Sequence, residues 1–174
     1  MMPPTLETSR LILRKLEISD LTAVFDYSSE PEYTQFLPYP CPTSIADFKS
    51  IFQNLLDNED SYIWAICLKG KHQLIGIIEI SLDSPTEANL HYEINHQFYN
   101  QGFATEATQT VITWTWENLP QIAQIIADTH SANLGSQRVM EKSGMNRIKT
   151  EFVTWDKYPE PVELVYYQIK RPIS

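Results

Sequence analysis

The segment Tyr99-Asn-Gln-Gly-Phe-Ala-Thr-Glu-Ala107 has the residue types and spacing best suited to chemistry in this chain. It places Gly102 and the small Ala104 where an extended stretch passes into a helical pattern. Such a turn exposes backbone N–H groups at the positive end of a helix dipole, and small side chains let an anion approach them. The segment therefore predicts a site for a phosphate or pyrophosphate at the start of that helix.

Two glutamates, Glu79 and Glu93, lie within apolar, strand-like runs of the sequence. Burial among apolar residues raises the pKa of a carboxyl group, which favours a role as a general base near neutral pH. Two alternatives stay open: Glu79 could face outward at a polar edge, and Glu93 could only pair with a cation or orient a ligand. His91 and His130 lie near strand ends, where a structural role is the commoner one. The four histidines and two cysteines show no metal-ligand spacing, so no metal is expected.

The composition is that of a globular protein with an acidic surface. Among 174 residues, 22 are acidic and 13 basic, giving a net charge of −9. This balance argues against nucleic-acid binding and is compatible with cationic partners such as amines, although solubility alone explains it equally well. No apolar run is long enough to span a membrane, and the N-terminus lacks a signal-peptide pattern. Cys41 and Cys67 are expected as free thiols, Cys67 in the core, and the protein as cytoplasmic.

Hydrophobic periodicity, capping residues and breakers predict the elements that position these residues. A Ser44-Ile-Ala-Asp47 pattern starts one helix, and Gly144 ends another. We expect strands over 10–16, 62–68, 74–82, 89–95, 124–130, 147–155 and 162–170, and helices over 20–28, 44–56, 102–119 and 134–143. This order predicts an α/β (α+β) fold: one domain spanning 1–174, with a mixed sheet of about six to seven strands and about four helices on both faces.

Motifs spread over nearly the whole chain resemble those of one family. They are Leu6-Glu-Thr-Ser-Arg-Leu-Ile-Leu-Arg14, Phe36-Leu-Pro-Tyr-Pro40, the 99–107 segment, and Asn133-Leu-Gly-Ser-Gln-Arg-Val-Met-Glu-Lys-Ser-Gly-Met145. In order and spacing they are similar to the GNAT N-acetyltransferase superfamily, and more narrowly to its ribosomal-protein N-terminal acetyltransferase (RimJ/RimL-like) branch. An aromatic residue at position 99 is common in that branch.

The resemblance implies where acetyl-CoA would bind. The strand over 90–95 would splay from its neighbour, so that the main chain of Tyr92 and Ile94 hydrogen-bonds the pantetheine arm. The Asn133 side chain would meet the cofactor near the pantetheine end. The pyrophosphate would lie in the backbone of one loop, formed by Asn100, Gln101, Gly102, Phe103, Ala104 and Thr105.

Two positions depart from the family pattern. Asn100 stands where glycine is common, although asparagine tolerates a left-handed backbone better than most residues. Met140 stands where many members carry a tyrosine that protonates the leaving thiolate, a role methionine cannot fill. Ser136 is the nearest polar candidate for that acid, and water is the other.

The resemblance implies an enzyme that moves acetyl from acetyl-CoA to a primary amine by direct attack in a ternary complex. The acceptor would be a protein N-terminal α-amine or a small amine, with Phe36, Tyr39, Trp155 and Tyr158 as candidate walls of its pocket. The alternative is a non-catalytic acyl-CoA-binding or sensing domain, and a dinucleotide binder is a weaker third. No nucleic-acid or membrane partner is expected, and the sequence leaves monomer and homodimer open.

Overall fold

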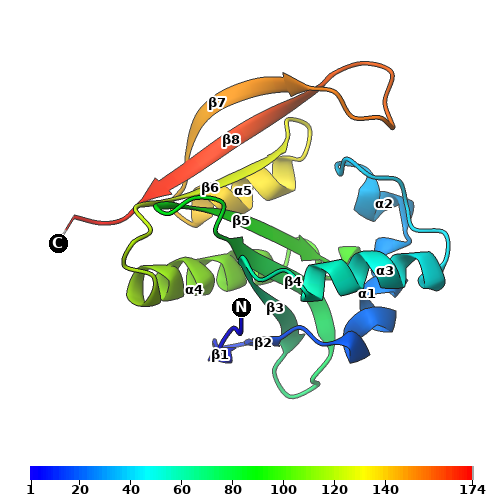
Figure 1. The fold of residues 1–174 in the computed structure, drawn as a ribbon, viewed down its shortest axis with the longest axis horizontal. Coiled ribbons are helices and arrows are strands. Elements are labelled where there is room, and N and C mark those ends of the chain that lie inside the picture. The colour runs from blue at the N-terminus through cyan, green and yellow to red at the C-terminus, as the bar shows by residue number, and fades with distance from the viewer. Residues whose placement is uncertain (174) are drawn as a thin grey trace.

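Apolar runs of the chain form the strands of one sheet, and amphipathic segments cover both of its faces (Figure 1). The computed structural model describes residues 1–173. Its strands are β1 Leu6–Glu7, β2 Leu11–Lys15, β3 Ser61–Leu68, β4 Leu74–Ser81, β5 Glu87–Ile94, β6 Gln124–His130, β7 Asn146–Val153 and β8 Val162–Lys170. Its helices are α1 Leu21–Ser28, α2 Pro31–Thr34, α3 Ile45–Leu56, α4 Phe103–Asn118 and α5 Leu134–Lys142, with 3₁₀ turns at Ile18–Asp20 and His96–Phe98.

The predicted α/β fold is confirmed, with two additions within residues 1–173. β1 adds an eighth strand, because a two-residue strand leaves no periodic signal in the sequence. α2 occupies a stretch expected to be a loop. Pro31 stands in its first turn, where a missing N–H costs no intrahelical bond. At the expected start of α3, Ser44 accepts a hydrogen bond from the backbone N–H of Asp47 at 3.1 Å.

The sheet opens between β5 and β6, as the resemblance implied. The strand order is β1-β2-β3-β4-β5-β6-β8-β7, and β5/β6 is its parallel pair. That pairing ends at Asn89 and Ile126, although β5 continues to Ile94 and β6 to His130. Beyond Asn89, β5 therefore presents an edge without a paired strand, while its other edge stays paired with β4.

Two apolar clusters sandwich the sheet. One packs α4 and α5 against one face and includes Trp64, Ile78 and Trp114. The rings of Trp64 and Trp114 meet edge to face, with their centres 5.0 Å apart. The other packs α1 and α3 on the opposite face and includes Phe52 and Cys67, so the expected core position of Cys67 is confirmed. Within residues 1–173, no helix has the length and apolarity needed to cross a membrane.

Gly76 on β4 allows the close approach of β5. A Cβ at this position would overlap the carbonyl oxygen of Glu93 and lie 2.9 Å from Cδ1 of Ile94. Any larger residue would push β5 away at the point where it carries Glu93.

Candidate active site

The turn before α4 has the backbone geometry of an anion-binding loop. Gly102 is the N-cap residue with φ of 81°, and Asn100, two residues earlier, has φ of 60°. Asn100 thus adopts the left-handed conformation that glycine favours, which accounts for asparagine at this position. The N–H groups of the first helical turn have no intrahelical acceptor, so those of Phe103, Ala104 and Thr105 are available to a ligand. Gln101 lies between the two left-handed residues.

The free edge of β5 carries Tyr92, Glu93 and Ile94, whose side chains alternate between the two faces. On the paired edge, Tyr92 is opposite Ile78 and Ile94 is opposite Gly76. Tyr92 points toward α5, while Glu93 lies on the face that α1 and α2 cover. The main chain of this segment therefore has one edge engaged in the sheet and one facing the opening toward β6.

Glu93 is held by two tyrosines that come from different helices. The Tyr27 hydroxyl of α1 donates to Oε1 of Glu93 at 2.5 Å, and the Tyr33 hydroxyl of α2 donates to Oε2. Burial raises the pKa of Glu93 and the Glu79 charge adds to that effect, while the two hydrogen bonds lower it, with a net upward shift. Among residues 1–173, no cationic side chain forms an ion pair with Glu93. The carboxyl group is thus prepared to accept a proton and lacks a counter-charge.

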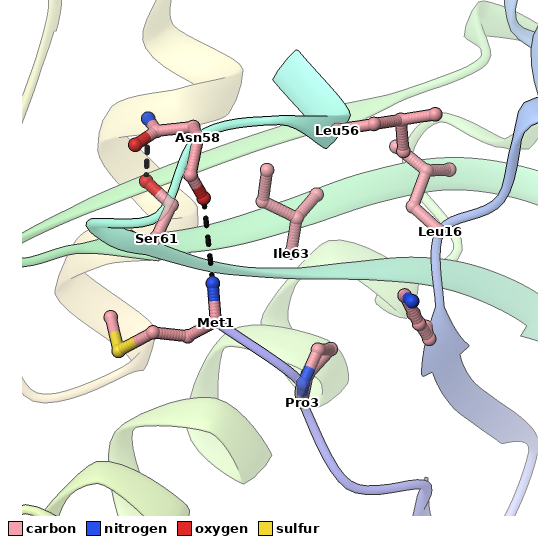
Figure 2. Close-up of a pocket in the computed structure, with 8 residues that line it drawn as sticks. Met1, Pro3, Leu16, Leu56, Asn58, Ser61 and Ile63 are labelled. Atoms are coloured by element: carbon pink, nitrogen blue, oxygen red, sulfur yellow. Dashed lines mark hydrogen bonds between the residues drawn. The ribbon is translucent and has the colours of Figure 1, made fainter. Parts of the chain in front are cut away.

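Glu79 lies on the same face, on central strand β4, and not at a polar edge of the sheet. It is half-buried, and the Ser61 hydroxyl donates to its Oε1 at 2.5 Å. Ser61 in turn accepts from Nδ2 of Asn58 at 3.0 Å (Figure 2). The pocket beside this serine, next to Met1, measures about 20 Å³, enough for about one water molecule.

The hydroxyl group of Ser136, on α5, lies next to that of Tyr92, on β5. Their oxygens are 2.8 Å apart, and the Tyr92 hydroxyl also donates to the carbonyl of Ser136 at 2.9 Å. Asn133 caps α5, because its amide oxygen accepts from the N–H of Ser136 at 3.2 Å. Met140 is 1% exposed and belongs to the apolar core against which Tyr92 also packs. The sequence gives no signal for this hydroxyl contact of Tyr92, because 44 residues separate Tyr92 from Ser136.

Aromatic side chains gather where the β7–β8 loop meets the end of α2. The Tyr158 hydroxyl donates to the carbonyl of Gln35 at 2.8 Å. The His130 ring, at the end of β6, lies 5.3 Å from the Phe36 ring and 5.9 Å from the Trp155 ring, measured between ring centres. His130 therefore belongs to this aromatic cluster, whereas His91 is exposed on β5. Of the four aromatic residues expected to line an acceptor pocket, the structure brings together Phe36, Trp155 and Tyr158.

Comparison with known proteins decides the family. Residues 10–146 match the family model described as an acetyltransferase (GNAT) domain. This chain belongs to the GNAT acetyltransferase family. The enzyme is 28% identical over 141 residues to the uncharacterized N-acetyltransferase YnaD of Bacillus subtilis, covering 80% of this chain and 81% of the relative. The GNAT assignment identifies the protein as an N-acetyltransferase.

Solved GNAT structures share the whole fold of this enzyme. An acetyltransferase from Bacillus anthracis matches with a TM-score of 0.86 at 24% identity, covering 97% of this chain and 99% of that one. Spermidine N-acetyltransferase from Vibrio cholerae, solved with CoA and spermine, gives 0.81 at 14% identity over 94% and 97%. The ribosomal L7/L12 α-N-protein acetyltransferase RimL, solved with CoA, gives 0.81 at 16% identity over 96% and 98%. At these identities the likeness establishes the fold.

Proposed function

We propose that this GNAT enzyme transfers acetyl from acetyl-CoA to a primary amine by direct attack in a ternary complex. The observation that carries the proposal is the position of Glu93, a carboxyl group with a raised pKa beside the opening between β5 and β6. The acceptor is either a protein N-terminal α-amine or a small amine. The two fold neighbours solved with CoA act on one kind each, so the fold does not choose between them.

Acetyl-CoA would bind along the loop and the free strand edge already described. The pyrophosphate would lie against the backbone of residues 100–105, at the positive end of the α4 dipole. The pantetheine arm would add to the free edge of β5 at Tyr92 and Ile94, as an extended peptide adds to a sheet. Asn133, at the start of α5, would meet the arm through the NH₂ group of its amide, since its oxygen caps the helix.

The reaction forms a C–N bond from the amine to the acetyl carbon and breaks the C–S bond of the thioester. Glu93 takes the proton that the amine must lose, directly or through water, and Glu79 modulates it by charge repulsion. An α-amine has a pKa of about 7.7–8.0, so part of such an acceptor is already neutral at pH 7 and ready to attack. Glu93 then takes the proton that the nitrogen loses as the C–N bond forms. Ser136, bonded to Tyr92, supplies the proton to the leaving sulfur and regains one from solvent, while Glu93 releases the amine's proton to solvent.

The experiment that tests this function measures CoA-thiol release from acetyl-CoA across a panel of amines. The panel contains peptides with free Ser or Ala N-termini, the same peptides N-terminally blocked, polyamines and aminoglycosides. Release with the free-N-terminus peptides alone would assign a protein N-terminal acetyltransferase, and release with a small amine would assign that acceptor class.

Each run includes Glu93→Gln, with Glu79→Gln as its partner on the same face. We expect Glu93→Gln to lower kcat about 10²–10⁴-fold, the range for loss of a general base, and Glu79→Gln to have a smaller effect. Acetyl-CoA binding with no turnover on any amine would support a sensing domain instead.

A further inference from the structure

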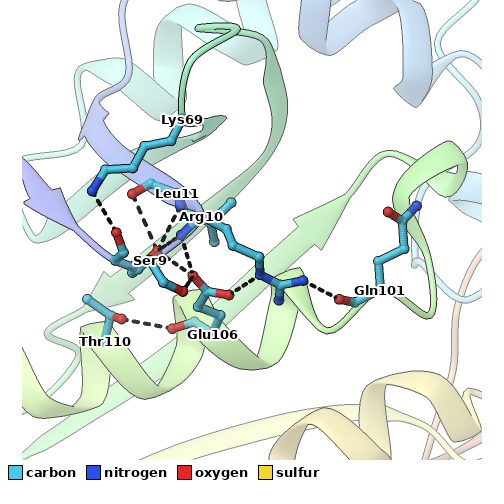
Figure 3. Close-up of polar contacts among 8 residues, drawn as sticks. Ser9, Arg10, Leu11, Lys69, Gln101, Glu106 and Thr110 are labelled. Atoms are coloured by element: carbon cyan, nitrogen blue, oxygen red, sulfur yellow. Dashed lines mark hydrogen bonds and ion pairs between the residues drawn. The ribbon is translucent and has the colours of Figure 1, made fainter.

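One arginine outside the described site holds the loop that precedes α4 (Figure 3). Arg10, in the turn between β1 and β2, donates from Nη1 to the carbonyl of Gln101 at 2.9 Å and from Nε to Oε2 of Glu106 at 2.7 Å. Its guanidinium carbon lies 4.5 Å from the centre of the Phe103 ring, and its Nη2 lies 3.4 Å from where a Cβ on Gly102 would be. A single side chain thus contacts the residues before, at and after the start of α4.

Glu106 completes this contact from the first turn of α4. Its carboxylate also accepts from the Thr8 hydroxyl at 2.5 Å, the Arg10 backbone N–H at 3.0 Å and the Ser9 hydroxyl at 3.2 Å. Burial would raise the pKa of Glu106, but the hydrogen bonds from Thr8 and Arg10 outweigh it and hold the pKa below its usual value. Glu106 is therefore an anion that joins the β1–β2 turn to α4.

The bond from Arg10 to Gln101 also fixes the direction of the N–H group that follows. In a trans peptide the carbonyl oxygen of Gln101 and the N–H of Gly102 point in opposite directions. Arg10 occupies the carbonyl side, so the Gly102 N–H is directed away from the Arg10 guanidinium. An anion bound at this N–H would lie on the opposite side of the peptide from the hydrogen bond that Arg10 makes.

We propose that Arg10 and Glu106 form a clamp that holds residues 100–105 in the phosphate-binding conformation before the cofactor arrives. Arg10 is a positioning residue, and the β1–β2 turn contributes to the acyl-CoA site through its contacts to residues 101–106. The inference rests on the proposed use of acetyl-CoA. Its physical basis is pre-organisation: a loop with two left-handed residues, at Asn100 and Gly102, loses less conformational freedom on binding if it is already ordered.

The test compares Arg10→Ala with Arg147→Ala, an exposed arginine on β7 that bonds the Thr150 hydroxyl. Arg10→Ala is expected to weaken CoA binding, measured by titration calorimetry, about 10–100-fold, the range for losing hydrogen bonds from a charged group. The KM for acetyl-CoA should rise in parallel, while kcat and the acceptor KM stay within about threefold. Amide exchange at residues 100–105 should become faster in the ligand-free variant, and Arg10→Lys should recover part of the affinity through one contact. Arg147→Ala should change none of these.

The outcomes separate the clamp from the proposed function. Wild-type protein that binds CoA, with an Arg10→Ala variant equal to it in affinity and loop exchange, would overturn the clamp alone. Failure of the wild-type protein to bind CoA would overturn acetyl-CoA use and the clamp with it. If Arg10→Ala does not fold, Glu106→Gln and Thr8→Ala remove other members of the clamp and are tested by the same titration and exchange measurements.

Discussion

The Tyr27 hydroxyl donates a 2.5 Å hydrogen bond to the carboxylate of Glu93, which lies 66 residues further along the chain. Because this bond lowers the pKa of Glu93, Tyr27→Phe should raise that pKa further. The base acts in its charged form, so the acidic limb of kcat/KM against pH should move to higher pH, with a loss of up to about 10–100-fold at pH 7. Tyr62→Phe, on β3, is the control. Superimposable pH profiles for Tyr27→Phe and wild type would remove Glu93 as the titrating base.

Glu93 also makes stability depend on pH. Its pKa is raised in the folded state, so at pH values between its unfolded and folded pKa the folded protein holds a proton that unfolding releases. Its contribution therefore falls as pH rises through that window, which starts near the unfolded value of about 4.3. The Glu93→Gln variant has no carboxyl group that titrates at this position. Its free energy of unfolding, relative to that of wild type, should therefore increase with pH across the window. Urea unfolding at a series of pH values measures the difference, and a difference constant in pH would contradict the prediction.

Gly76 should tolerate no side chain, because a Cβ would overlap the Glu93 carbonyl oxygen and crowd Ile94. Gly76→Ala is expected to destabilise the protein by about 1–3 kcal/mol or more, as overpacking of a close-packed interior does. Gly135→Ala in α5 is the matched control, since its Cβ would meet nothing closer than Oδ1 of Asn133 at 3.7 Å. It should be neutral or stabilising by about 0.5 kcal/mol. Equal melting temperatures for the two variants would show that β4 and β5 shift without cost to accommodate the added methyl group.

The proposed role of Ser136 as the acid predicts which variants slow protonation of the leaving thiolate. Ser136→Ala should lower kcat about 10²-fold, and Tyr92→Phe by a smaller factor, because it removes the hydroxyl bonded to Ser136. An acetyl thioester with a more acidic thiol should restore part of the Ser136→Ala rate, since that thiolate leaves without a proton. Met140→Leu, a core replacement of similar volume, should stay within about twofold of wild type. Full activity of Ser136→Ala with acetyl-CoA would point to water as the acid.

Asn100 offers a test of the left-handed loop. Its φ of 60° is easy for glycine and costs alanine about 1–2 kcal/mol. Asn100→Gly should therefore keep the CoA affinity of wild type, whereas Asn100→Ala should weaken it by up to about 30-fold. Calorimetric titration of both variants with CoA provides the comparison. Equal affinities would mean that this residue's backbone conformation does not matter for binding.

The sequence by itself determined the order and type of nearly every element. Largely apolar runs such as 74–81 and the cap at Ser44 are local signals, and local signals decide helix against strand. The turn at Gly102 was equally readable, because a left-handed N-cap residue before a helix is a property of a few consecutive residues. β1 and α2 were missed because two and four residues are too few to show a period.

Only the tertiary structure decided what surrounds the chemical groups. Sequence reasoning identified Glu93 as a carboxyl group in an apolar run, but Tyr27 and Tyr33 come from helices about sixty residues away and carry no linear pattern toward it. The same holds for Tyr92 with Ser136, and for Arg10 with Glu106, which are 96 residues apart. Spacing along a chain fixes neighbours within one element, whereas contacts between elements depend on how the sheet brings them together. Those contacts set the pKa of Glu93 and hold the turn before α4.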